Sequence, residues 1–247
     1  MREVRLERKR VGMGPLILVN AAHPLSDVQP PELVAVNRQF PGVLLERRAA
    51  GLLAACLQAA GSRGAIVPVS GWRSRAEQQA IWDSSLAEHG KAFTRSYVAL
   101  PGCSEHETGL AIDLGQAMAH IDFLRPAFSY DGVCGTFRHL AARYGFIQRY
   151  RRDKEALTGI AEEPWHFRYV GTPHALLMEE NSLCLEEYSA FLQAGPRRCR
   201  LPGGGSAQVS YIPCGGEVTV ASLPDGCCQL SGDNDGGFIL TAWEVSP

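Results

Sequence analysis

Two short segments of this chain bring histidine and acidic residues together in a pattern typical of a metal-dependent hydrolase. His106 and Asp113 lie in the first segment, and in the second His166 follows Glu163 by three residues. A catalytic zinc ion needs three nitrogen or oxygen ligands and one open position for water. His106, Asp113 and His166 meet that need, and Glu163 remains as a general base that takes a proton from water and passes it to a leaving amine. Any one of them alone would more often be an ordinary strand residue, but the four together indicate a site.

The surrounding residues resemble the VanY and VanXY family of zinc D,D-carboxypeptidases and D,D-dipeptidases. The family patterns S-x-H-x-x-G-x-A-x-D and E-x-W-H are matched by Ser104, His106, Gly109, Ala111 and Asp113 and by Glu163, Trp165 and His166. A third match, to S-G-Y-R-S-x-x-x-Q, consists of Ser70-Gly71-Trp72-Arg73-Ser74 with Gln78. Trp72 departs from the pattern, because many relatives carry Tyr there. The resemblance covers the chain from about residue 15 to residue 195.

The resemblance implies Zn²⁺ as the cofactor and a role for further residues. Arg73 would face the scissile carbonyl, where a permanent cation stabilises the developing oxyanion together with the metal. Ser104 and Gln78 would bind the terminal D-alanine carboxylate of the substrate or its amide, and Trp165 would belong to the substrate-binding wall. If these two residues do not bind substrate, we expect Ser104 to cap a turn and Gln78 to face solvent on a helix.

Two classes of function fit these residues. The first is a zinc metallopeptidase that hydrolyses the D-Ala-D-Ala dipeptide or D-Ala-D-Ala ends of peptidoglycan precursors, which the resemblance associates with vancomycin resistance. An L,D-carboxypeptidase of peptidoglycan recycling would use the same zinc chemistry, and the sequence does not decide between the two stereospecificities. The second class is a non-catalytic zinc fold that binds peptide. Such a fold would have no need of the unligated Glu163 beside the metal.

Other motifs give weaker signals. Cys103 suggests a thiol peptidase, but zinc binding would consume the histidine that such a nucleophile needs as its base. Residues 231–237 are similar to a calcium loop, but neither register places both the glycine and the last acidic ligand correctly, which favours a tight β-turn. The cysteines near the C-terminus lack the spacing of a structural zinc site. Residues 149–152 with Lys154 form a basic cluster, expected to be a solvated face that could border the site.

The composition excludes several classes of protein. Of the 247 residues, 45% are hydrophobic and 20% are charged, as in ordinary globular proteins. The net charge of -2 gives no reason to expect nucleic acid as a partner. The basic start is not followed by an apolar run, and no window resembles a membrane span, so we expect neither an export signal nor an anchor. The eight cysteines are then expected to be free thiols in the cytoplasm. The sequence does not indicate the oligomeric state.

Hydrophobic periodicity and capping signals predict the elements that must position the site. Strands are expected at 16–20, 65–70, 108–114, 146–150 and 164–170, and helices at 46–60, 74–89, 136–143 and in two pieces from 172 to 194. Pro68 favours an edge strand. In the strand 164–170 the aromatic residues alternate with His166 and Arg168, so His166 should point away from the aromatic face.

The pattern predicts an α+β fold in which helices pack on a central antiparallel sheet that carries the zinc site. From Arg197 onward the composition changes to β-like stretches at 208–213, 217–223 and 237–245, separated by Gly, Pro and Asp. We therefore expect a peptidase domain at 1–196 and a small β-rich extension at 197–247 that packs on it. The resemblance assigns no catalytic role to this extension.

Overall fold

A four-stranded antiparallel sheet forms the centre of the larger part of the molecule. The computed structural model describes residues 1–26 and 32–244. The sheet has the strand order β4-β5-β7-β6. These strands are β4 (Ile66–Ser70), β5 (Ala111–Gln116), β7 (His166–Tyr169) and β6 (Phe146–Gln148). The predicted α+β fold with a central antiparallel sheet is confirmed, and Pro68 lies in the edge strand β4, where its missing N–H removes no ladder bond.

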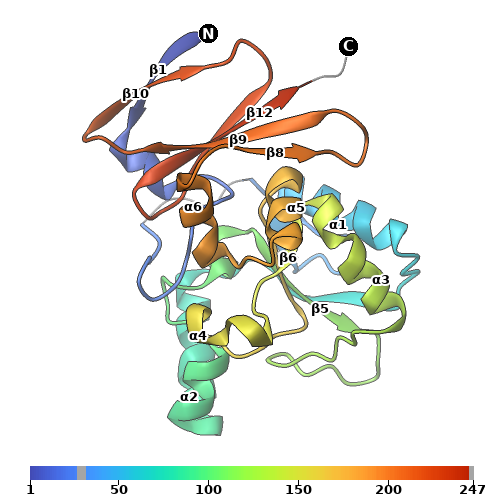
Figure 1. Cartoon of the computed structure of the whole chain (residues 1–247). Coiled ribbons are helices and arrows are strands. Elements are labelled where there is room, and N and C mark those ends of the chain that lie inside the picture. The colour runs from blue at the N-terminus through green and yellow to red at the C-terminus, as the bar shows by residue number, and fades with distance from the viewer. Residues whose placement is uncertain (27–31, 245–247) are drawn as a thin grey trace.

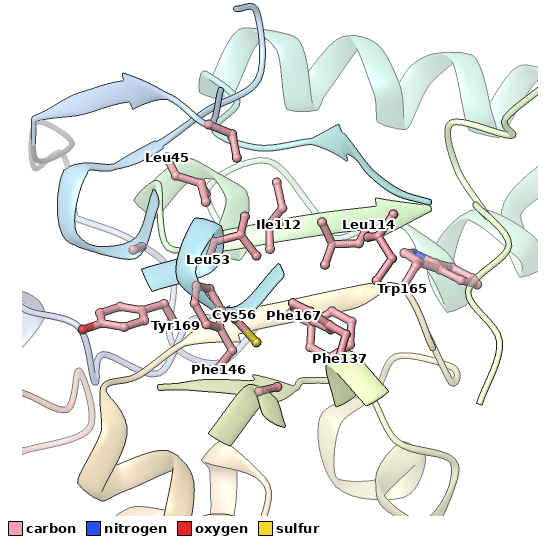
Figure 2. Packing of buried hydrophobic residues seen from close by; sticks show 14 of the residues in the cluster. Leu45, Leu53, Cys56, Ile112, Leu114, Phe137, Phe146, Trp165, Phe167 and Tyr169 are labelled. Atoms are coloured by element: carbon pink, nitrogen blue, oxygen red, sulfur yellow. The ribbon is translucent and has the colours of Figure 1, made fainter. Parts of the chain in front are cut away.

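One face of this sheet is covered by α1 (Arg47–Ala59) and α3 (Gly132–Ala141), which contact each other. Alternate residues of β5 and β7, Ile112, Leu114 and Phe167, point into the same apolar cluster as Leu53 and Phe137 (Figure 2). Because side chains alternate along a strand, the residues between them must point to the other face. The core on one side therefore leaves Asp113 and His166 on the opposite side.

The helix α2 (Arg75–Tyr97) begins with the capping box that the sequence predicts. The Ser74 side chain accepts from the backbone N–H of Glu77, and the Glu77 carboxylate accepts from the backbone N–H of Ser74. The helical conformation breaks at Gly90, as predicted, with φ 78° and ψ 171°, but a second helical piece that the sequence did not predict continues after this kink to Tyr97. A hydrogen bond between the Ser85 and Thr94 hydroxyls, 2.9 Å long, ties the two sides of the kink together.

The remaining helices of this part are short. α5 (Thr172–Glu180) and α6 (Leu185–Gln193) match the two predicted pieces, and α4 (Glu155–Thr158) is a single turn. A small hairpin consists of β2 (Leu33–Ala35) and β3 (Leu44–Glu46). Four 3₁₀ turns complete the described elements: η1 (Arg8–Gly12), η2 (Glu105–Thr108), η3 (Ala142–Tyr144) and η4 (Arg152–Lys154).

The C-terminal strands gather at one end of the molecule, opposite α2 (Figure 1). They comprise β8 (Arg197–Arg200), β9 (Ser206–Pro213), β10 (Val218–Leu223), β11 (Cys228–Gly232) and β12 (Gly237–Glu244). One sheet has the order β11-β12-β9-β8, and β10 pairs with β1 (Arg2–Glu7) from the other end of the chain. The domain boundary after residue 196 stays a prediction, but this pairing places the first strand with the C-terminal strands. Val245, included in the last predicted strand, lies outside the described residues.

The strand predicted at residues 16–20 is wrong. This apolar segment is buried, but side chains and loop carbonyls take the place of a neighbouring strand as its hydrogen-bond partners. Leu16 N–H donates to the Ser231 hydroxyl at 3.0 Å, and Leu18 N–H donates to the carbonyl of Asp233 at 2.9 Å. The predicted tight turn at 231–237 is confirmed, since Asp233 Oδ1 accepts from the N–H groups of residues 235, 236 and 237.

Within the described ranges, none of the helices combines the length and the apolar character needed to cross a bilayer. All eight cysteines fall in those ranges and are free. Burial raises the pKa of Cys56 to about 12, so this thiol is unreactive at neutral pH.

His174 joins the two parts of the molecule and should make stability sensitive to acid. Its Nδ1 lies 2.8 Å from the Tyr188 hydroxyl of α6 and its Nε2 lies 2.9 Å from the Thr241 hydroxyl of β12. Burial lowers the pKa of His174 to about 3. As pH falls below about 6.5, the unfolded chain takes up a proton that the folded chain refuses, so the free energy of unfolding decreases until the pH reaches the folded pKa.

We therefore predict that wild type loses about 1.4 kcal/mol more stability than a His174→Gln variant between pH 7.5 and pH 5.5. Urea unfolding of both proteins at the two pH values measures this. A stability difference that does not change with pH would contradict the prediction.

Candidate active site

The site is built on a cross-strand pair. In the antiparallel register of β5 and β7, Asp113 lies directly opposite His166, and Asp113 also faces Ser70 of β4. Paired residues of an antiparallel ladder project from the same face of the sheet. Asp113 Oδ1 accordingly lies 2.9 Å from His166 Nδ1, and both side chains are buried. The predicted orientation of His166, away from the aromatic face of its strand, is confirmed.

His106 reaches this pair from the turn η2, which precedes β5. Its Nδ1–H donates to the carbonyl of Gly71 at 2.7 Å, and its Nε2 lies 3.1 Å from Asp113 Oδ2. The turn ends at Gly109, which has φ 72°, and a Cβ there would lie 2.7 Å from Leu33 Cδ2. The glycine of the H-x-x-G pattern is therefore favoured by its left-handed backbone conformation, and a Cβ there would also displace the end of the Leu33 side chain.

Gly71 brings the chain after β4 close to a neighbouring backbone. A Cβ at Gly71 would lie 2.2 Å from the carbonyl oxygen of Leu44, and the next residue, Trp72, donates its N–H to that oxygen at 2.7 Å. This contact holds the short segment that presents the Gly71 carbonyl to His106 and carries Arg73 into the site. The S-G-x-R pattern thus has a packing reason for its glycine.

The three predicted ligands form a compact donor set. One ligand atom each from His106, Asp113 and His166 lies within 4.8 Å of the others, and all three residues are buried. Two imidazoles and one carboxylate are ligands that zinc prefers in catalytic sites, where three protein ligands leave one position open. The residues present therefore fit a zinc ion.

The charges of the site favour a bound cation. Burial lowers the pKa of His166, but the carboxylates of Asp113 and Glu105, which accept from its protonated ring, outweigh this effect and raise the pKa to about 9. At His106, burial and the cation of Arg73 lower the pKa to about 4. Burial would raise the pKa of Asp113, but the two histidines hold it well below its usual range. The cluster thus holds a proton between Asp113 and His166, and a metal ion can replace that proton.

Glu163 and Arg73 flank the three ligands. Glu163 Oε2 lies 3.6 Å from His166 Nδ1, and burial raises the pKa of Glu163 to about 8 with the charges of the protein alone. A divalent cation beside this carboxyl group would favour its ionised form, which a general base needs. Arg73 Nη2 lies 3.6 Å from Asp113 Oδ2, and its buried Nε has no hydrogen-bond partner in the described part of the chain.

All eight predicted site residues line one cleft: Arg73, Gln78, Ser104, His106, Asp113, Glu163, Trp165 and His166. Gln78 is only 1% exposed, which excludes the alternative of a solvent-facing residue. Its Nε2 donates to the carbonyl of Ala99 at 2.8 Å, while its buried Oε1 has no partner among the described residues. Ser104 precedes η2, and Trp165 packs against the core as well as lining the cleft. The catalytic and binding roles of these residues stay predictions.

Sequence analysis missed several residues of the cleft. Glu105 stands at a variable position of the S-x-H pattern, and its side chain is fully buried against His166. Tyr150 lies with its ring centre 4.9 Å from that of His166. Apolar side chains from distant elements add a wall that no motif indicated, namely Ile81, Tyr97, Phe123, Leu124 and Ile160.

The expectation that the basic cluster at 149–152 is a solvated face is wrong for its first member. Arg149 is 1% exposed and donates to the carboxylates of Glu105 and Glu186 at 2.6 to 2.8 Å. Arg151 and Arg152 keep to the surface and pair with Asp153 and Glu162. A run of like charges therefore concealed one arginine whose partners come from distant parts of the chain.

Comparisons with known proteins agree with this geometry. The VanY family, described as D-alanyl-D-alanine carboxypeptidase, matches residues 42–172. The bifunctional D-Ala-D-Ala dipeptidase and D-Ala-D-Ala carboxypeptidase VanXYC of Enterococcus gallinarum is 42% identical over 182 residues, which are 73% of this chain and 96% of that protein.

Several solved structures are similar to this chain, including those of two vancomycin resistance enzymes. The vancomycin resistance D,D-dipeptidase VanXYg, in complex with a D-Ala-D-Ala phosphinate analog, has a TM-score of 0.96 and 45% identity, over 98% of this chain and 99% of that one. A mutant of the vancomycin resistance D,D-pentapeptidase VanY from the VanB-type cassette, in complex with Zn(II), has a TM-score of 0.59 and 34% identity, over 70% of this chain and 98% of that one. The matched residues include the three ligands, Glu163 and Arg73, and the chain belongs to the VanY family of D-alanyl-D-alanine carboxypeptidases.

Proposed function

We propose that this chain is a zinc-dependent D,D-carboxypeptidase with D,D-dipeptidase activity that hydrolyses D-Ala-D-Ala ends of peptidoglycan precursors in the cytoplasm. The observation that carries the proposal is the convergence of three buried ligand atoms within 4.8 Å of one another, with the carboxylate of Glu163 beside them. The likeness to VanXYg over nearly the whole chain supports the same substrate class and a role in vancomycin resistance. The eight free thiols support a reducing compartment.

His106, Asp113 and His166 would hold the zinc ion, which when bound polarises the scissile carbonyl and lowers the pKa of water. Glu163 takes the proton from the attacking water and passes it to the amine of the departing D-alanine. Arg73 donates to the oxyanion that develops on the carbonyl oxygen, and its unpaired Nε is a donor free for that purpose. A module that only binds peptide would not need this combination of base and cation.

Gln78 supports recognition of an amide at the scissile end. Because Gln78 Nε2 already donates to Ala99, the atom left for substrate is the acceptor Oε1, which suits an N–H rather than a carboxylate. Ser104 and Trp165 line the same cleft and would complete the contacts to the terminal D-alanine. An ester in place of the amide would leave this buried acceptor without a partner.

The first prediction from this proposal concerns the metal. The purified protein should contain about one zinc ion per chain, since the three ligands form one site. His106→Ala and His166→Ala should each lose it, whereas His89→Ala, on the exposed side of α2, should keep it. Metal analysis of the four proteins measures this. A protein that binds no zinc, or zinc retained in both ligand variants, would exclude the proposed site.

The second prediction concerns the base. Glu163→Gln should fold and bind zinc but lose about 100- to 10,000-fold in turnover of D-Ala-D-Ala, as expected for removal of a general base. Glu162→Gln is the matched control, because this neighbour pairs with Tyr130 and Arg152 at the surface. Release of D-alanine reports the rate. Wild-type turnover in the Glu163 variant would remove this residue from the mechanism.

The third prediction concerns the substrate. Cleavage should be strong for D-Ala-D-Ala ends, weaker for D-Ala-D-Ser and small for D-Ala-D-lactate. An added hydroxyl changes affinity by about 10- to 200-fold in an apolar pocket, whereas loss of a hydrogen-bonded N–H costs more. Side-by-side assays of kcat/KM on these three ends and on a tetrapeptide test this. Equal cleavage of the three would contradict the resistance role, and preferred cleavage of the tetrapeptide would indicate an L,D-carboxypeptidase.

A further inference from the structure

Glu105 faces the ligand His166 from the side of the ring opposite Asp113. His166 Nε2 lies 3.5 Å from Glu105 Oε2 as an ion pair, and neither atom has a hydrogen-bond partner in the described part of the chain. The exposed fraction is 5% for the His166 side chain and 0% for that of Glu105. Bulk solvent therefore does not reach either atom, and each is the nearest protein partner left for the other.

The orientation of the His166 ring determines which nitrogen faces the other ligands and which faces Glu105. Nδ1 is the ring atom that faces Asp113 and Glu163, at 2.9 and 3.6 Å, so it is Nδ1 that joins the ligand cluster. An imidazole that ligates a metal through one nitrogen carries its proton on the other. For His166 that proton is on Nε2, pointing at Glu105. His106 is set in the opposite sense, since its Nδ1–H donates to Gly71 and leaves Nε2 for the metal.

Two buried arginines hold the Glu105 carboxylate in place. Arg149 Nε donates to Glu105 Oε1 at 2.7 Å, and Arg168 Nη1 lies 3.0 Å from the same oxygen. With Oε1 occupied by two cations, Oε2 is the oxygen that remains for His166. Both guanidinium groups can only donate hydrogen bonds. The atom at the Oε1 position must therefore be an acceptor, and an N–H group there would be unfavourable.

We propose that Glu105 is a positioning residue for the metal ligand His166, which it holds in the tautomer that presents Nδ1 to the zinc ion. The inference rests on the proposed function, because it concerns the same metal site. Glu105 is not one of the three ligands, and it acts through the ring of His166. It occupies a position that the S-x-H pattern leaves open.

The arginines connect this carboxylate to parts of the chain outside the residues matched by the VanY family. Arg168 Nη2 donates to the carbonyls of Pro15 and Ile17 at 3.0 and 3.1 Å. Arg149 makes two hydrogen bonds to Glu186 of α6. The segment that supplies Pro15 and Ile17 is in turn fastened to the turn between β11 and β12, where Asn234 Nδ2 donates to the carbonyl of Leu18 at 2.9 Å. The C-terminal strands thereby support the shell behind the metal site.

The test is the zinc affinity of a Glu105→Gln variant, measured by competition with a chelator. Arg149 and Arg168 require an oxygen at the Oε1 position, so the new amide would turn its NH₂ toward His166 Nε2 and favour the wrong tautomer. We expect zinc binding about 10- to 100-fold weaker than in wild type, as for loss of other carboxylate partners of ligating histidines. Glu107→Gln is the matched control from the same turn, since Glu107 accepts from Gly102 N–H and pairs with Arg75 rather than with His166.

Urea unfolding of the metal-free proteins separates positioning from simple stabilisation of the fold. Glu105→Gln with unchanged zinc affinity, whatever its stability, would overturn the inference. A wild-type protein that binds no zinc would instead overturn the proposed function. The tautomer can also be measured without any variant, from the ¹⁵N and ¹H shifts of the histidine rings in zinc-loaded wild type. A proton on His166 Nε2 is expected, and metal bound through Nε2 would exclude Glu105 as its partner.

Discussion

Asp113 and His166 face each other across β5 and β7, and the geometry of the whole site follows from that single register. The carboxylate lies between both imidazoles, with Oδ1 2.9 Å from His166 and Oδ2 3.1 Å from His106. A slip of one residue between the strands would turn every side chain to the opposite face. The ligands would then enter the apolar core, and Ile112 and Phe167 would enter the cleft. The aromatic and aliphatic core therefore protects the site, because it makes any other register expensive.

The many charged side chains buried around the ligands need partners of opposite charge. Removing a charged side chain from water costs several kcal/mol unless an opposite charge and hydrogen bonds accompany it. Behind the ligands, Glu105, Arg149, Arg168 and Glu186 pair in sequence, and the first three are at most 1% exposed. In front of the ligands, the buried Nε of Arg73 has no hydrogen-bond partner in the described part of the chain, and Glu163 Oε2 lies 3.6 Å from His166 Nδ1. Each charged group behind the ligands therefore lies against an opposite charge, whereas the guanidinium of Arg73 in front of them keeps a donor without a protein partner among the described residues.

The N-terminal and C-terminal parts of the chain help to satisfy the buried charges behind the metal site. β1 pairs with β10, and the segment after η1 lies between the C-terminal strands and the central sheet, where its carbonyls accept from Arg168. His174 adds a buried link from α5 to α6 and β12. Residues far outside the VanY match thus complete the surroundings of the arginines that lie against the metal site.

What the sequence determined by itself is local. The capping box before α2, the alternation in β7 that turns His166 from the core, and the spacing of the ligand motifs each depend on neighbours within a few residues, and the structure reproduces them. The tertiary structure alone decided what depends on distant partners. Residues 16–20 have the composition of a strand but bond to a turn more than 200 positions away, and β1 finds its partner in β10. Arg149 and Glu105 are of residue types that usually lie at the surface. They are buried because the folded chain brings them together as an ion pair, which the sequence alone does not reveal.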